Sequence, residues 1–167
     1  DDNGFTITRN IGDAEIFGLT MQTDTALNAN ASLSSSFFLN HSRVMRSTPR
    51  DETFSTMLPN IAPYGARLSL RYSLDLVDGS ELLAASNLGY TGESVLDIDA
   101  LRQARQGNFV SVDMSLTLRK PVWEIAIEAN NITNTRGNRF SFGNPFQVRR
   151  EDQKVPLRPF NLRLSAK

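Results

Sequence analysis

Trp123-Glu124-Ile125-Ala126-Ile127-Glu128-Ala129-Asn130-Asn131 is the stretch of this sequence that decides the fold. Apolar and polar residues alternate along it, with Trp123, Ile125, Ile127 and Ala129 in one set of positions. Glu124, Glu128 and Asn130 occupy the other set, and the small Ala126 lies between the two glutamates. Since successive side chains of a β-strand point to opposite faces of a sheet, this alternation predicts a strand with one apolar and one polar face.

The same alternation recurs on both sides of this stretch. It is strictest over residues 66–77, where every second residue is apolar and Arg67, Arg71 and Asp75 fall in the polar set. The final residues, 160–167, repeat the pattern. The sequence therefore predicts about seven strands, at 14–27, 31–44, 66–77, 81–91, 109–119, 123–131 and 160–167.

The connections between these strands alternate between short and long. Short turns are expected at 28–30, 78–80 and 119–122, and Asp78-Gly79-Ser80 is a typical hairpin sequence. Long, polar segments are expected at 45–65, 92–108 and 132–159, with a short helical turn within 95–106. Outer-membrane barrels have short periplasmic turns and long outer loops, so we expect 45–65, 92–108 and 134–159 at one end of the sheet.

Composition excludes several classes of protein. Of the 167 residues, Lys plus Arg and Asp plus Glu number 18 each, so the chain lacks the basic excess typical of nucleic-acid binding. With no cysteine, disulfides and thiolate metal sites are impossible. His41 is the only histidine, and we expect no metal site, no cofactor and no enzymatic activity.

The environment of the two faces is a separate question, because alternation alone does not distinguish a soluble sandwich from a membrane barrel. Charged residues in mid-strand positions and aromatic residues near predicted strand ends favour an all-β, antiparallel up-and-down meander from a large transmembrane barrel. In that case the sheet is curved, the first and last strands do not pair, and Arg67, Asp113 and Glu128 lie on the concave face. The convex, poorly buried face then holds Leu68, Leu70, Tyr72, Val112, Leu116, Ile125 and Leu164.

Several motifs, in order along the chain, resemble those of the TonB-dependent outer-membrane receptors. Residues 10–19, NIGDAEIFGL, resemble the family's N-x-G-x-A-x-I-x-G strand. Residues 58–63, LPNIAP, resemble its LPNVP element, and residues 128–134, EANNITN, resemble its v-x-N-l-x-N/D element. The motifs at residues 137–140, 143–146 and 156–159 resemble those of a subgroup of the family found in sphingomonad-type bacteria.

The resemblance implies that residues 1–167 are the C-terminal segment of a barrel of about 22 strands. The family's plug domain and TonB box match no part of the chain. The family lies in the outer membrane and takes up ferric siderophores, cobalamin or glycans. The implied partners are outer-membrane lipid, the plug, TonB and a small nutrient ligand. The family normally ends on an aromatic residue; this chain ends on Lys167, and a Phe at position 168 would continue the apolar set.

Two groups of residues are candidate contacts for a ligand or for the plug. Arg67, Arg71, Asp113 and Glu128 lie in the polar sets of the predicted strands, where pairing between strands is the alternative role. Arg139, Arg149 and Arg150 lie in the last long segment, which also contains Arg136, Lys154 and Arg158; ordinary solvated charge is the alternative there.

Two other functions remain open from the sequence. One is a passive porin or structural barrel of the outer membrane. The other is a soluble β-sandwich that binds carbohydrate. The latter would bury the apolar side chains between two sheets, so the burial of those residues distinguishes it from a barrel.

Overall fold

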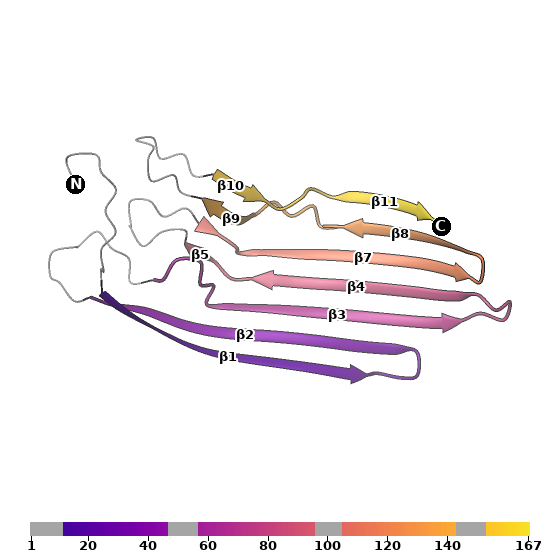
Figure 1. Ribbon diagram of the computed structural model, residues 1–167, viewed down its shortest axis with the longest axis horizontal. Helices are drawn as coiled ribbons and strands as arrows, with labels where there is room; N and C mark the ends of the chain where they lie inside the picture. The colour runs from indigo at the N-terminus through magenta and orange to yellow at the C-terminus, as the bar shows by residue number, and fades with distance from the viewer. Residues whose placement is uncertain (1–11, 47–56, 96–104, 143–152) are drawn as a thin grey trace.

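Seven strands form one antiparallel sheet, in which each strand pairs with the next long strand along the chain (Figure 1). The computed structural model describes residues 12–46, 57–95, 105–142 and 153–167. All seven predicted strands are present, and their bounds differ from the predicted ones by no more than two residues. In sheet order they are β1 (Gly12–Ala26), β2 (Ala31–Arg46), β3 (Tyr64–Asp75), β4 (Glu81–Thr91), β7 (Phe109–Lys120), β8 (Trp123–Asn130) and β11 (Asn161–Ala166).

Two small hairpins within the long connections were not predicted. One pairs β5 (Ser94–Val95) with β6 (Arg105–Gln106), and the other pairs β9 (Asn138–Phe142) with β10 (Gln153–Pro156). The expected helical turn within 95–106 is therefore wrong at both of its ends; residues 96–104 lie outside the described part of the chain. The backbone groups at these ends bond across a hairpin, which leaves them unable to bond along a helix. Within the described ranges, no helix is long and apolar enough to span a membrane.

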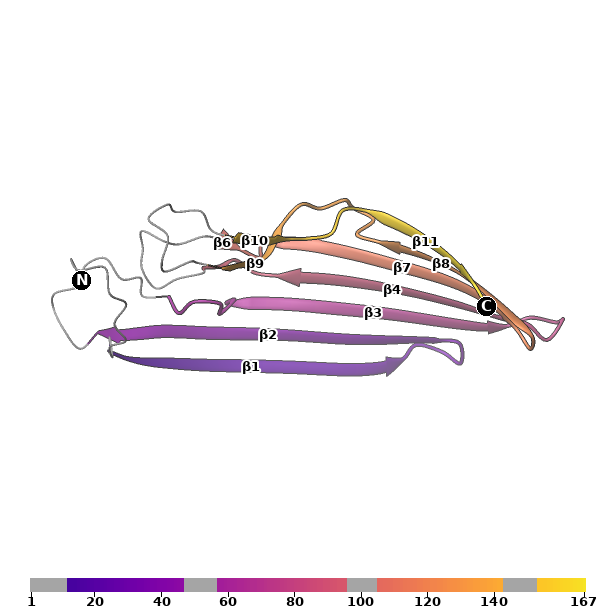
Figure 2. The ribbon, with the colours of Figure 1, turned by 45° about the horizontal axis from the view of Figure 1, so that its top comes forward.

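The connections sort by length, as predicted. The turns that follow β1, β3 and β7 lie together at one end of the sheet, whereas β5, β6, β9 and β10 lie at the other end (Figures 1 and 2). The portions 47–56, 96–104 and 143–152 of the long connections fall outside the described residues. An antiparallel meander with alternating connection lengths therefore separates a short-turn end from a long-connection end.

Cross-strand register gathers the apolar side chains on one face of the sheet. Leu68 is opposite Leu88, and Leu88 is opposite Val112; farther along, Leu116 is opposite Ile127, which is opposite Leu164. Since directly opposite residues point to the same side, these rows form a continuous apolar surface.

That apolar surface is exposed. Leu70 is 42% exposed and Leu164 is 71% exposed, and Leu68, Tyr72, Leu116 and Ile125 are exposed as well. Val112 is an exception to the expectation, because it is half-buried; Leu88 on β4 lies opposite it, and its carbonyl oxygen accepts from the N–H of Ile132, just after β8. Among the described residues, the only buried apolar side chains are Val44, Val95 and Ala126. The core of a β-sandwich is therefore absent from the described part of the chain.

The first and last strands of the sheet do not pair with each other, as predicted. β1 bonds only to β2, and β11 bonds only to β8 within the seven-stranded sheet. Figure 2 shows one twisted, curved layer of strands. Each of the two edges therefore presents unpaired backbone groups along one side.

Candidate ligand-binding hollow

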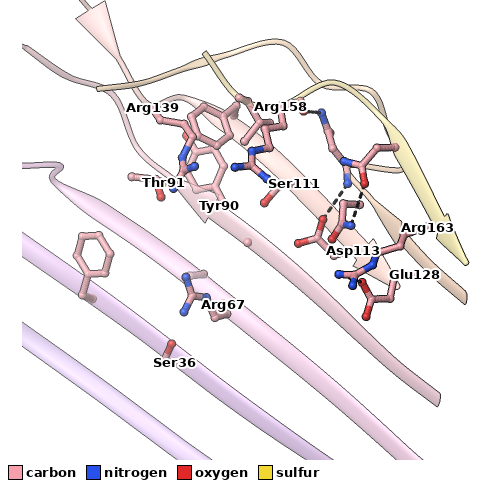
Figure 3. A pocket seen from close by; sticks show the side chains of 18 residues that line it. Ser36, Arg67, Tyr90, Thr91, Ser111, Asp113, Glu128, Arg139, Arg158 and Arg163 are labelled. Carbon is pink, nitrogen blue, oxygen red and sulfur yellow. Dashed lines mark hydrogen bonds and ion pairs between the residues drawn. The ribbon is translucent and has the colours of Figure 1, made fainter. Parts of the chain in front are cut away.

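A hollow of about 790 Å³ lies on the polar face of the sheet (Figure 3). Arg67 on β3 lies within it, opposite Ser36 on β2 and Gly89 on β4. Gly89 is in turn opposite Ser111 on β7. The row therefore has one long side chain between small ones, which explains the open space around the Arg67 guanidinium. A hollow that extends from β2 to β11 on this face is consistent with the expected concave side.

The two arginines on β3 form no ion pair with a described residue. Arg67 has Ser36 and Gly89 as its cross-strand neighbours, and Arg71 has Ser32 and Ala85. The ion pairs among the described residues all involve other cations. Among the described residues, neither arginine has a carboxylate as its direct cross-strand neighbour, so pairing between strands finds no support there.

Both carboxylates of the hollow have partners. Asp113 on β7 accepts a hydrogen bond of 2.8 Å from the backbone N–H of Asn131. Glu128 on β8 is 3.9 Å from the guanidinium of Arg163 on β11. The hollow has three further arginines, and none of them has a carboxylate partner among the described residues: Arg67, Arg139 and Arg158. The hollow is therefore positively charged.

Asn131 determines how the chain leaves β8 and passes beside the hollow. It is 4% exposed and has a φ of 49°, a left-handed conformation that Asn adopts more readily than most residues. Its side-chain oxygen accepts from the Thr135 N–H at 3.0 Å. Its side-chain nitrogen donates to the carbonyl oxygens of Thr135 at 2.9 Å and Arg158 at 2.8 Å. One buried amide thus holds together the two segments that flank this part of the hollow.

The described parts of the three long connections are also bonded to one another. The Gln106 amide donates to the Asn60 side chain at 2.7 Å, and the Asn60 N–H donates to the Val95 carbonyl at 2.8 Å. The Asn138 amide donates to the Arg105 carbonyl at 3.1 Å, and the Leu157 N–H donates to the Gly137 carbonyl at 2.7 Å. Arg139 and Arg158 directly follow two of these bonded residues, so the backbone positions of both arginines are held by the network.

The structure brings together four of the seven residues singled out from the sequence. Arg67, Asp113, Glu128 and Arg139 line the hollow, as Figure 3 shows. Arg71 lies apart from them, beside a second hollow of about 550 Å³ near the short-turn end, because it is four residues farther along β3. Arg149 and Arg150 lie outside the described residues.

Sequence reasoning did not find the two phenylalanines that line the hollow. Phe38 packs against Gly65, and Phe109 packs against Gly137; a Cβ on either glycine would lie 2.4 Å or 2.5 Å from the ring. The alternation of the sequence could have revealed them, since Phe38 and Phe109 both occupy positions of the polar sets of their strands. Apolar side chains at such positions indicate a local cover or a contact with a ligand.

Metal binding has no support in the described ranges, where no three His, Cys, Asp or Glu side chains form a group able to hold an ion. His41 is exposed on the face of the apolar rows, opposite Phe17 on β1.

Comparison with known proteins supports the fold. No protein-family model matches the chain, and no curated protein sequence matches it significantly. The structure is similar to the crystal structure of the ferric yersiniabactin uptake receptor FyuA from Yersinia pestis, with a TM-score of 0.74 and 18% sequence identity. The similarity covers 94% of this chain and 24% of the receptor chain. The chain therefore spans about a quarter of that receptor, and the likeness shows the all-β, antiparallel fold alone.

Proposed function

We propose that this chain is the C-terminal part of the barrel of a TonB-dependent outer-membrane receptor. The receptor would import a scarce nutrient of the class of ferric siderophores, cobalamin or glycans. Residues 1–167 would be one segment of the barrel, and the plug and TonB box would lie elsewhere in the full-length protein. The motif order in the sequence and the structural similarity to an uptake receptor support this proposal.

The observation that carries the proposal is that the apolar face of the sheet is exposed, which is the reverse of a soluble protein. Leu70, Leu116 and Leu164 belong to rows of exposed apolar side chains, while Arg67, Asp113 and Glu128 lie on the opposite face. In water, so large an apolar surface would favour association or aggregation. In a bilayer the same surface contacts lipid, and the charged face lines the aqueous or plugged interior.

The free edges and the two ends of the sheet fit the same proposal. β1 and β11 each have one unpaired edge, which would bond to neighbouring strands in a closed barrel. The short turns would face the periplasm, and the long connections would face outward. The positively charged hollow is bordered by residues of the last long connection, so a ligand would reach it from outside the cell.

The sequence left two alternatives open, a passive porin or structural barrel and a soluble carbohydrate-binding β-sandwich, and the exposed apolar rows argue against the second. They differ from an energy-coupled importer in measurable ways. A passive porin conducts ions steadily, whereas a plugged barrel stays closed. A soluble module stays out of the outer-membrane fraction. An enzyme would instead hydrolyse a lipid or peptide ester, and this hydrolysis would depend on His41 or a nearby serine.

Single-cysteine labelling of the full-length protein tests the membrane topology. Residues 1–167 contain no cysteine, so a single cysteine introduced there is the only thiol of this segment. Suitable variants are Val122→Cys in a short turn and Arg136→Cys in a long connection. We expect an impermeant maleimide to label the Arg136→Cys variant in intact cells and the Val122→Cys variant only after permeabilisation. Equal labelling of both in intact cells, or recovery of the protein in the soluble fraction, would contradict the proposal.

Two further measurements on the purified full-length protein test energy coupling. We expect no steady conductance in planar bilayers and specific retention by the immobilised periplasmic domain of TonB. Steady conductance without TonB binding would favour the passive porin. Absence of both conductance and TonB binding would favour a structural barrel.

A further inference from the structure

We infer that the hollow around Arg67 binds the anionic part of the imported ligand, through carboxylate-, phenolate- or phosphate-type oxygens. This inference rests on the proposed import function and narrows its ligand to a negatively charged organic molecule. It concerns the described residues of the hollow alone: Arg67, Arg139, Arg158, Phe38 and Phe109.

The first support is the unbalanced charge of the hollow. Asp113 is bonded to the Asn131 N–H, and Glu128 lies beside Arg163. Arg67, Arg139 and Arg158 have no carboxylate partner in the described residues. A guanidinium presents a planar fork of N–H donors that matches the oxygens of a carboxylate or phosphate. With Arg163, the described lining holds four guanidinium groups against the two carboxylates Asp113 and Glu128, so an anion that enters the hollow meets an excess of two positive charges.

The second support is the space around Arg67. Its neighbours Ser36 and Gly89 are too small to fill the surface on either side of the guanidinium. An arginine that only stabilised the sheet would be expected beside a carboxylate, as Arg119 is, where Glu81 and Glu124 lie 3.2 Å and 2.8 Å away. The contrast between Arg119 and Arg67 on the same face indicates that Arg67 faces an occupant from outside the sheet.

The third support is the pair of rings at the hollow. Phe38 and Phe109 are held against Gly65 and Gly137, so their positions are restricted before any ligand arrives. Each ring offers apolar surface beside the arginines. The combination suits a ligand with anionic oxygens on an apolar or ring-containing body.

The same groups would discriminate against neutral ligands. An uncharged glycan that covered the hollow would remove water from three guanidinium groups without supplying a negative charge. Desolvation of an unpaired charge is costly, so a neutral occupant would bind more weakly than an anion of similar size. The hollow thus favours an anionic nutrient over the neutral glycans that the proposed function also allows.

The test uses the full-length protein, purified in detergent, with the planar aromatic trisulfonate pyranine as a fluorescent probe. Binding is followed by anisotropy, with citrate and maltopentaose as anionic and neutral competitors. We expect citrate to compete and maltopentaose not to compete. Raising the ionic strength from about 0.01 M to about 0.15 M shortens the screening length from roughly 30 Å to roughly 8 Å and should weaken probe binding.

The decisive variant combines Arg67→Gln, Arg139→Gln and Arg158→Gln. We expect it to bind pyranine at least about tenfold more weakly, because three charge-assisted contacts are lost. Arg71→Gln is the matched control, since Arg71 is also an arginine on the polar face of β3 with no ion pair among the described residues but lies outside the hollow. Its affinity should stay within about twofold of the wild type. The single variant Arg67→Lys should retain more affinity than Arg67→Gln, because it keeps the charge.

Three outcomes would overturn the inference: wild-type affinity in the triple variant, competition by maltopentaose equal to that by citrate, or no probe binding by the wild type. The last would be expected if the plug filled the hollow. Labelling, conductance and TonB retention are measured on the same preparations. A closed, outer-membrane protein that binds TonB but no anion would overturn this inference and leave the proposed import function intact.

Discussion

The Asp113 carboxylate accepts a hydrogen bond of 2.8 Å from the backbone N–H of Asn131. This bond connects the middle of β7 to the first residue after β8, at the border of the positively charged hollow. It satisfies a backbone donor that has left the sheet, and it holds the Asp113 carboxylate against the loop. The same contact therefore fixes the path of the loop at the border of the hollow.

Replacement of Asn131 tests how this loop is held. Asn131→Ala should destabilise the folded protein by about 1–3 kcal/mol, because partly buried backbone groups of Thr135 and Arg158 lose their hydrogen bonds. Amide hydrogen exchange at Thr135 should become faster. Asn131→Gly is the matched control, since it loses the same side chain but tolerates the positive φ. It should be less destabilising than Asn131→Ala; a larger loss in the glycine variant would contradict this account.

The contact between Phe38 and Gly65 predicts a coupled effect of two substitutions. A Cβ at Gly65 would lie 2.4 Å from the Phe38 ring, so Gly65→Ala should cost about 1–3 kcal/mol of stability. In the Phe38→Ala background the same change should cost less, because the ring is gone. The denaturation midpoints of the two single variants and the double variant give the coupling energy. Strict additivity would show that the ring does not restrict position 65.

Charge placed on the apolar face should distinguish lipid from water as its surroundings. Leu70 lies midway along β3 on the apolar face, and its neighbour Ser69 faces the other side. In lipid vesicles, Leu70→Arg should destabilise the full-length protein by about 2–4 kcal/mol if position 70 is near the bilayer midplane. Ser69→Arg should have a much smaller effect. Similar stabilities of the two variants in denaturant titrations would argue against lipid contact at Leu70.

The turn after β3 predicts an acidic group with an unusually low pKa. Asp78 accepts hydrogen bonds from the Ser80 hydroxyl and from the Ser80 N–H at 3.1 Å, and its other oxygen is 2.9 Å from the Lys120 ammonium. The bond from the Ser80 hydroxyl, followed by the Lys120 contact, lowers the pKa of Asp78 well below its ordinary value. We expect Ser80→Ala to raise this pKa by removing the largest contribution.

The lowered pKa of Asp78 determines how its contribution to the free energy of unfolding changes with pH. Because the pKa of Asp78 is lower in the folded protein, its stabilising contribution is complete above the ordinary pKa of about 3.9. That contribution declines as the pH falls through the folded-state pKa. Carboxyl chemical shifts of Asp78, followed against pH by NMR, measure the titration. A midpoint at the ordinary value in the wild type would contradict the contacts described for this turn.

The sequence by itself determined the strands and the face on which each side chain lies. The alternation of Leu68, Leu70 and Tyr72 with Arg67 and Arg71 is converted into two faces by the geometry of a single strand. Short turns place successive strands side by side, so the order of the sheet was predictable too. These properties depend on residues that are close in sequence, and for that reason strand bounds agreed to within two residues.

Only the tertiary structure decided which residues share a site. Whether Arg67 lies beside Gly89 or beside a carboxylate depends on the register of two strands, and the separate position of Arg71 follows from the same register. The position of Arg158 near the hollow depends on its carbonyl bond to Asn131, 27 residues away in sequence. Alternation is a property of one strand's backbone, whereas register and loop path are set by contacts between distant residues. No local pattern in the sequence contains that information.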